Sequence, residues 1–254
     1  MSLQPIAAFA VEVEPPRLEL TIPADQPTGG SLEVANRSGK RVSVQVKTGG
    51  YRFLQPGLEL PSAQGWFSFE PSSLILGPQS STRVNYSITP PPNVAQDAAG
   101  EYLAAILIDE RPAGESAAAS GSKVTIVPRF AMPVYLKIKG RELIQVEIGD
   151  LSLEGDSSSL KVRTTLTNQG TVHIRPAGAL TILEQSGKTV QTELLGKGLP
   201  LLPTARLEIP AAVPLPPPGR YRAVVTLETG PGKLLQKEKA FEVTADRQVA
   251  VKEI

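Results

Sequence analysis

The stretch Leu32-Glu33-Val34-Ala35-Asn36-Arg37-Ser38-Gly39 carries the pattern that decides the fold. Apolar and polar residues alternate, and the run ends at an asparagine that is followed by serine and glycine. Alternation with period two predicts a β-strand with one buried face, and Asn, Ser and Gly are typical of a turn. The second half of the chain repeats the pattern in Val162-Arg163-Thr164-Thr165-Leu166-Thr167-Asn168-Gln169-Gly170. The sequence therefore contains an internal repeat of a strand and its turn.

A second shared feature follows in each half. Proline-rich loops at residues 90–92 and 214–218 precede Gly-x-Tyr and an apolar strand, with Tyr102 in the first half and Tyr221 in the second. A tyrosine at this place resembles the tyrosine corner of immunoglobulin-like sandwiches, in which the ring is buried and the hydroxyl bonds upstream backbone. We predict an all-β protein of two tandem immunoglobulin-like β-sandwich domains, at residues 9–139 and 142–245.

The composition agrees with this fold class and excludes several functions. With 24 Pro and 22 Gly in 254 residues, a long-helix protein is excluded, and the absence of Cys excludes disulfides and thiolate chemistry. Lys+Arg and Asp+Glu are 26 and 25, scattered along the chain, so no basic footprint for nucleic acid exists. No run of 18 apolar residues occurs, so no membrane span is expected.

Catalytic motifs are missing from the sequence. The chain has one histidine, His173, which alternation places on a solvated or partly covered face of a strand. No Gly-x-Ser-x-Gly or Walker motif occurs, and Asp109 and Glu110, as strand neighbours, point to opposite faces. We therefore predict a protein that is not an enzyme, with no cofactor, no metal site and no catalytic residue.

The single tryptophan leaves two interpretations open. Trp66 lies in Trp66-Phe67-Ser68-Phe69, which could form a platform that stacks on a sugar. Core packing is the interpretation favoured by the alternation of the two phenylalanines. Exposure of Trp66 beside polar side chains would support a carbohydrate-binding domain.

The N-terminus suggests export. Ala8-Phe9-Ala10 has the small-x-small form of a signal-peptidase site, although the basic and apolar regions that should precede it are missing. We expect that a signal peptide was removed and that the protein is periplasmic or extracellular. An ordinary apolar N-terminal strand is the alternative.

The candidate functional element is a long apolar strand at residues 123–138. Its alternating positions Phe130, Met132 and Val134 continue an earlier apolar pair, Val124 and Ile126. Pro128 and Pro133 cannot donate hydrogen bonds to a sheet, which favours an edge strand. An edge strand of this kind can add itself to a partner's sheet, and these five apolar residues are the predicted partner contacts. The alternative is simply the last strand of the first domain running into the linker.

The first domain resembles the periplasmic chaperones of pilus assembly. The resemblance rests on the first strand at residues 15–20, on the 32–38 strand and turn, on the passage at 69–78, and on Gly100-Glu101-Tyr102. It implies two immunoglobulin-like domains outside the cytoplasm and donation of the last strand of the first domain to an incomplete pilin sandwich. The partner would then be a pilin-like subunit or a surface protein.

The resemblance also implies a carboxylate anchor. In that family a basic residue on the first strand and another on the donated strand grip the carboxylate at the C-terminus of the pilin. Arg17 matches the first by its place in the strand. The second position is not matched cleanly, and Arg129 is the nearest candidate.

A second class of function stays open at this stage. Residues 168–178 and 218–221 resemble the second domain of exported bacterial surface proteins that carry two such sandwiches and a membrane anchor. Such proteins bind cell-surface proteins or wall components. The alternative to the chaperone is therefore a surface scaffold or adhesion protein, anchored or secreted, and the sequence does not give the oligomeric state.

Overall fold

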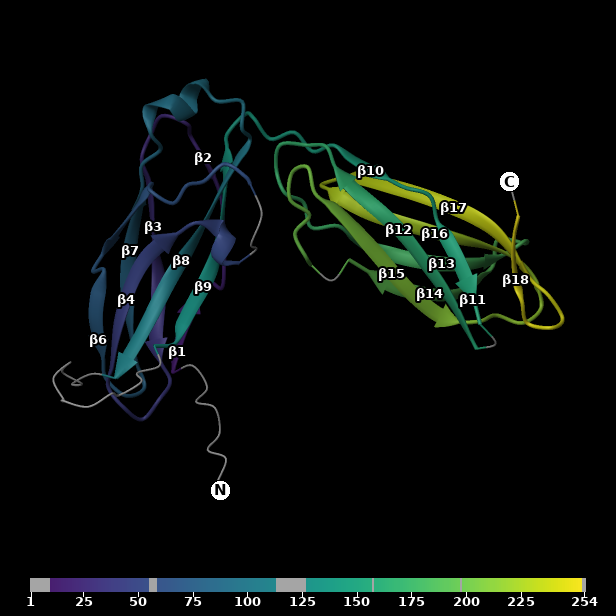
Figure 1. Cartoon of the computed structure of the whole chain (residues 1–254), viewed down its shortest axis with the longest axis horizontal. Helices are drawn as coiled ribbons and strands as arrows, with labels where there is room; N and C mark the ends of the chain where they lie inside the picture. The colour runs from purple at the N-terminus through teal and green to yellow at the C-terminus, as the bar shows by residue number, and fades with distance from the viewer. Residues whose placement is uncertain (1–9, 55–58, 113–126, 157, 197, 253–254) are drawn as a thin grey trace. The chain divides into compact units, whose positions relative to one another are not determined.

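A computed structural model of the chain describes residues 10–54, 59–112, 127–156, 158–196 and 198–252. The chain divides into two compact units, Met1–Arg141 and Glu142–Ile254, each built from strands packed as two sheets (Figure 1). The described residues also include two short 3₁₀ helices, η1 (Tyr51–Phe53) and η2 (Pro92–Gln96), both in the first unit. Among these residues no helix is long and apolar enough to cross a membrane.

The first unit has a four-stranded and a five-stranded sheet. The four-stranded sheet has the order β1-β3-β7-β5 and contains β1 (Val11–Glu14), β3 (Thr28–Asn36), β5 (Phe67–Glu70) and β7 (Ser80–Ile88). The five-stranded sheet has the order β2-β9-β8-β4-β6 and contains β2 (Leu18–Ile22), β4 (Val42–Gly49), β6 (Ser73–Leu76), β8 (Glu101–Pro112) and β9 (Arg129–Ile138). The first strand changes sheets at Pro15-Pro16-Arg17, because β1 pairs with β3 and β2 pairs with β9.

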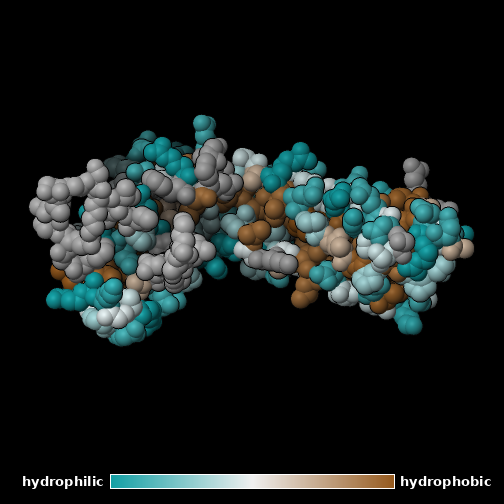
Figure 2. Space-filling view, turned by 60° about the horizontal axis from the view of Figure 1, so that its bottom comes forward, coloured by the Kyte–Doolittle hydropathy of each residue, from teal (hydrophilic) through white to brown (hydrophobic). Residues whose placement is uncertain are grey.

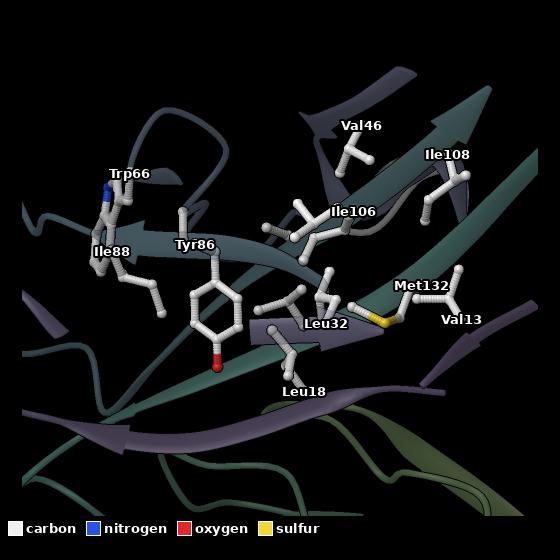
Figure 3. Close-up of a cluster of buried hydrophobic side chains, with 14 of the residues drawn as sticks. Val13, Leu18, Leu32, Val46, Trp66, Tyr86, Ile88, Ile106, Ile108 and Met132 are labelled. Atoms are coloured by element: carbon white, nitrogen blue, oxygen red, sulfur yellow. The ribbon is translucent and has the colours of Figure 1, made fainter. Parts of the chain in front are cut away.

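The core of the first unit lies between these two sheets. Leu32 from β3, Ile106 from β8 and Met132 from β9 are completely buried and point toward one another (Figure 3). Leu32 comes from the apolar half of an alternating strand whose polar half faces outward, whereas β8 is apolar and buried on both faces from Tyr102 to Ile108. Burial of this apolar area, at about 25 cal/mol per Å², stabilises the sandwich.

The second unit repeats the two-sheet arrangement. One sheet contains β10 (Val146–Ile148), β11 (Ser152–Gly155), β12 (Ser159–Asn168) and β15 (Arg206–Pro214); β12 is central, with β15 on one side. The other has the order β14-β13-β16-β17-β18 and contains β13 (Ala177–Glu184), β14 (Thr189–Leu195), β16 (Gly219–Gly230), β17 (Lys233–Val243) and β18 (Val249–Lys252). Its separate core includes Leu166, Leu180 and Phe241.

The two repeated asparagines hold equivalent places. Asn36 is buried; its amide donates to the carbonyl oxygens of Lys40 and Gly77, at 2.7 and 2.8 Å. Asn168 is also buried, and its amide donates to the carbonyl oxygens of Val172 and Leu201, both at 2.9 Å. Each asparagine thus joins its own turn to a distant segment, since buried polar groups are stable only when they are bonded.

The two tyrosines differ in their partners. The ring of Tyr221 is buried, and its hydroxyl donates to the carbonyl oxygen of Pro217 at 2.9 Å, as in a tyrosine corner. Tyr102 is also buried, but its hydroxyl donates to the carboxylate of Asp97 at 2.5 Å. Burial, together with the bond to Asp97, raises the pKa of Tyr102.

One prediction about exposure is wrong. His173 was expected on a solvated or partly covered face, but it is 3% exposed and precedes an isolated bridge between Ile174 and Leu201. The prediction from alternation fails because His173 does not lie in a regular strand.

Among the described residues no cluster of His, Asp and Glu could hold a metal ion.

Candidate functional site

Strand β9 is an edge strand over only part of its length. On one side it pairs with β8 from Arg129 to Lys137. On the other side β2 pairs with it in parallel, with Leu18 opposite Val134 and Ile22 opposite Ile138. Residues 129–133 therefore have no strand neighbour on that side among the described residues, whereas residues 134–138 lie inside the sheet. The predicted edge at 123–138 is thus corrected to 129–133 within the described part of the strand.

The main-chain groups of this edge have a definite direction. The N–H of Ile138 donates to Gly100 on the β8 side, and the N–H of Lys139 donates to Ile22 on the β2 side. Because main-chain groups alternate along a strand, the odd-numbered residues present theirs toward β2. Pro133 is odd-numbered, so its main chain faces β2, where its missing N–H is not needed. A proline that faced β8 would remove a hydrogen bond between β8 and β9. Ala131 therefore presents its N–H and C=O outward, at the centre of the 129–133 edge.

The apolar side chains of β9 face the core of their own domain. Met132 and Val134 are completely buried, and Phe130 is half-buried against the same core. This differs from the expectation that they contact a partner, because the five-stranded sheet uses this face to cover the four-stranded one. Val124 and Ile126 lie outside the described residues.

The outer face of β9 carries a charged cluster. Asp109 on β8 has a buried side chain, 5% exposed, between Arg129 of β9 and Lys47 of β4. Its carboxylate accepts hydrogen bonds from Nε and Nη2 of Arg129, at 2.5 and 3.0 Å, and from Nζ of Lys47 at 2.6 Å. The bonds from Arg129, followed by those from Lys47, lower the pKa of Asp109 to about 2. The cluster fixes the first residue of the edge to two neighbouring strands.

The pairing of Asp109 with Lys47 is not apparent from the sequence, in which Asp109 stands out only as the strand neighbour of Glu110. The two residues are 62 positions apart, and no local pattern connects them. The pairing follows from the register of β4 with β8, which places Lys47 opposite Leu107.

The two candidate anchor residues do not converge. Arg17 is half-exposed and pairs with Glu19, with 2.7 Å between Nε and Oε1. It precedes Leu18, the first residue of β2, which lies opposite Val134, whereas Arg129 is the first residue of β9, five residues before Val134. Arg129 binds Asp109 instead. Each guanidinium therefore has a carboxylate of its own chain as its partner.

A tyrosine pair that the sequence reasoning missed covers the other end of β9. Tyr135 is 2% exposed, although it lies on the outer face of the sheet. The hydroxyl groups of Tyr135 and Tyr51 are 2.7 Å apart, and the rings pack edge to face. η1 brings Tyr51 to this face, so the side chain of Tyr135 is covered there. The open edge at 129–133 is set by the pairing of β2 with residues 134–138.

Trp66 belongs to the core of the first unit. It is 8% exposed, and its ring lies 4.5 Å from the ring of Tyr102 (Figure 3 shows Trp66 beside Ile88). The core interpretation is therefore confirmed. A shielded indole cannot offer its face to a sugar, so the carbohydrate-binding alternative loses its support.

Solved structures with a similar fold are fimbrial chaperones. The class 5 fimbriae chaperone CfaA matches with a TM-score of 0.50 and 11% identity, over 90% of this chain and 98% of that chain. The Pseudomonas aeruginosa CupB2 chaperone matches with a TM-score of 0.49 and 15% identity, over 89% and 98%. The Salmonella enterica SafA pilin in complex with the SafB chaperone gives 0.44 and 15%, over 91% and 97%.

The match to CfaA shows the fold. No family model and no curated protein sequence matches the chain. The chain has the two-domain immunoglobulin-like fold of the fimbrial chaperones, and the fold class predicted from the sequence is confirmed. The resemblance to pilus-assembly chaperones is confirmed at the level of the fold.

Proposed function

We propose that this protein is a pilus-assembly chaperone-like binding protein that acts outside the cytoplasm. It adds residues 129–133 of β9 to the sheet of a partner protein, such as a pilin-like subunit, and performs no catalysis. The observation that carries the proposal is the open edge of β9, with the main-chain groups of Ala131 directed outward. The likeness of fold to CfaA supports the same function.

The form of the edge suits strand addition. Main-chain hydrogen bonds supply affinity in this mode, so the buried state of Met132 and Val134 is no obstacle. The bonds between Arg129 and Asp109 hold the start of the edge in extended conformation before a partner arrives, which lowers the entropic cost of binding.

The test replaces one outward N–H. Ala131→Pro removes the central outward donor, and β9 already accepts Pro133 in the same orientation, so the fold is retained. Ala131→Val is the matched control, because it keeps the N–H and adds a side chain of similar bulk. Binding is measured as the amount of each variant that co-purifies with a pilin-like subunit exported by the same organism.

We expect wild type and Ala131→Val to bind the subunit and keep it soluble, and Ala131→Pro to lose binding at least tenfold. Trp66 fluorescence confirms that both variants are folded. Equal binding by a folded Ala131→Pro variant would remove the edge from the mechanism. Failure of the wild type to bind would contradict the chaperone-like function itself.

A further inference from the structure

The outer face of the five-stranded sheet in the first unit carries exposed cations at one end. Strand β4 turns its valines to the core, so Ser43 points outward. The register places Ser43 between Ile75 of β6 and Arg111 of β8, and both share its face. Arg41, which directly precedes β4, lies at the same end. In Figure 2, which brings forward the side that is lowest in Figure 1, hydrophilic side chains gather on this unit.

These side chains are open to solvent. Ile75 is 60% exposed, and Arg41 and Arg111 are exposed as well. Neither arginine takes part in an ion pair among the described residues. All three side chains are therefore accessible to a partner, and their replacement leaves the core of the unit intact.

Two further cations lie beside Arg111. Lys47 of β4 and Arg129 of β9 hold the carboxylate of Asp109 between them, and the side chain of each is 41% exposed. Asp109 comes two residues before Arg111 on β8, so the two share a face and lie about 7 Å apart along the strand. Among the described outward residues in these rows of the sheet, Asp109 is the only acidic one.

This single carboxylate does not balance the cations at this end. Asp109 has a buried side chain, and its oxygens accept three hydrogen bonds from Lys47 and Arg129. Arg41 and Arg111 add positive charge without bringing a carboxylate. Like charges on one face repel one another, and acidic groups of a partner relieve this repulsion. The charge of this end therefore selects an acidic occupant.

The residue types favour the carboxylates of a protein over a membrane or a nucleic acid. A guanidinium group binds a carboxylate through two parallel hydrogen bonds. A membrane-binding cluster contains about four to eight Lys or Arg, whereas Lys47 and Arg129 are already bound to Asp109. Ile75 adds an apolar contact that a phosphate backbone would leave unused.

We propose that this end of the sheet, the basic face formed by Arg41, Lys47, Ile75 and Arg111, binds an acidic segment of a partner protein. The segment directs carboxylates to the two arginines and an apolar side chain to Ile75. Ile75 and Arg111 are two strands apart, about 10 Å, which an extended segment spans in about three residues. The inference does not rest on the chaperone-like function, because the segment does not pair with the β9 edge.

The test uses the full chain and synthetic peptides. The probe is a labelled Glu-Glu-Ser-Leu-Ser-Glu-Glu peptide, in which the leucine lies three positions from a glutamate on either side. One control peptide has Gln in place of every Glu, and the other has Ser in place of Leu. Binding is measured by fluorescence anisotropy at low and at high salt. The net charge of the chain is +1, so general attraction of an acidic peptide is weak.

We expect the Glu peptide to bind at low salt and to be released at high salt, because salt screens exposed charges. The Gln peptide should bind at least about tenfold more weakly, since it keeps the shape of the side chains and loses their charge. The peptide without leucine should bind about threefold more weakly, since it loses the contact with Ile75.

The double variant Arg41→Glu with Arg111→Glu should weaken binding of the Glu peptide at least about tenfold. Its matched control is Arg83→Glu with Arg206→Glu, which changes the net charge equally at exposed arginines of other sheets and should bind like wild type. Ile75→Ser should weaken binding about threefold. Circular dichroism confirms that each variant is folded.

The proposal is overturned if the Glu peptide does not bind, if the Gln peptide binds equally, or if both double variants lose the peptide equally. Anionic lipid vesicles or a single-stranded oligonucleotide that bind more tightly than the peptide, and that Arg41→Glu with Arg111→Glu releases, would also contradict it and assign the face to a membrane or a nucleic acid. Ala131→Pro should not change peptide binding, so the failure of the basic face and the failure of the β9 edge are separable.

Discussion

At the scale of single residues, buried polar side chains hold the loops to the sheets. Asn36 and Asn168 each satisfy three or more main-chain groups from a buried position, within separate units. The sequence marked both as turn residues at the end of a strand. Their burial could not be foreseen, because the partner carbonyls at Gly77 and Leu201 lie 41 and 33 residues away.

Asp109 gives the first unit a measurable dependence on pH. Its pKa falls from 3.8 to about 2 in the folded chain, mainly through Arg129. Because the folded pKa is lowered, the contribution to stability is complete above pH 4 and is lost as the pH falls from about 4 to about 2. The contribution of Asp109 to the free energy of unfolding is at most about 2 kcal/mol, because solvent screens its half-exposed partners Lys47 and Arg129.

We therefore expect Asp109→Asn to be less stable than wild type at neutral pH and the difference to shrink toward pH 2. This difference in stability is measured by urea unfolding. The unfolding is followed by the fluorescence of Trp66, which lies in the same unit. Asp25→Asn, an exposed carboxylate of the same unit, is the control. A difference that stays constant between pH 5 and pH 2 would contradict the proposed ion pair.

At the scale of strands, pairing decides which residues of β9 are accessible. The alternation and the prolines of 128–138 indicated an edge strand with one apolar face. Register shows that β2 covers residues 134–138 and that the apolar face belongs to the core. Periodicity identifies a buried face but does not say whether the domain itself or a partner buries it.

Close packing of β13 against β16 gives a prediction at this scale. A Cβ on Gly178 would lie 1.9 Å from the main-chain oxygen of Thr226, so the strands must separate if the glycine is replaced. Gly178→Ala should destabilise the second unit by about 2–3 kcal/mol. At Gly149, the control, a Cβ would meet its nearest atom at 3.4 Å, which is ordinary contact.

Hydrogen exchange of each variant measures the effect strand by strand. Gly178→Ala should speed exchange throughout β12–β17, with β3–β9 unchanged, and Gly149→Ala should resemble wild type. Equal exchange in the two variants would mean that the second unit relaxes around residue 178 at little cost.

At the scale of the whole molecule, two hydrophobic cores stabilise two units. Buried residues of the first unit form one cluster and those of the second another. Each unit has more than 110 residues and a two-sheet core, which is enough for independent folding. This arrangement agrees with a chain that must hold both sandwiches without disulfides.

We expect the fragments 1–141 and 142–254 to fold separately. Each should show strand circular dichroism and a cooperative unfolding transition, and Trp66 in the first fragment should stay shielded from acrylamide. A fragment with no protected amides would show instead that its core depends on the other unit.

The sequence by itself determined the fold class, the repeat of two sandwiches and the buried tyrosine corner at Tyr221. These features follow from local patterns: alternation with period two, turn residues and the Gly-x-Tyr approach. Only the tertiary structure decided which five residues of β9 remain an edge, how Asp109 joins Lys47 and Arg129, and how Ile75 and Arg111 come to share one face. Those features depend on register between strands distant in the chain, and register is set by packing of the whole sandwich.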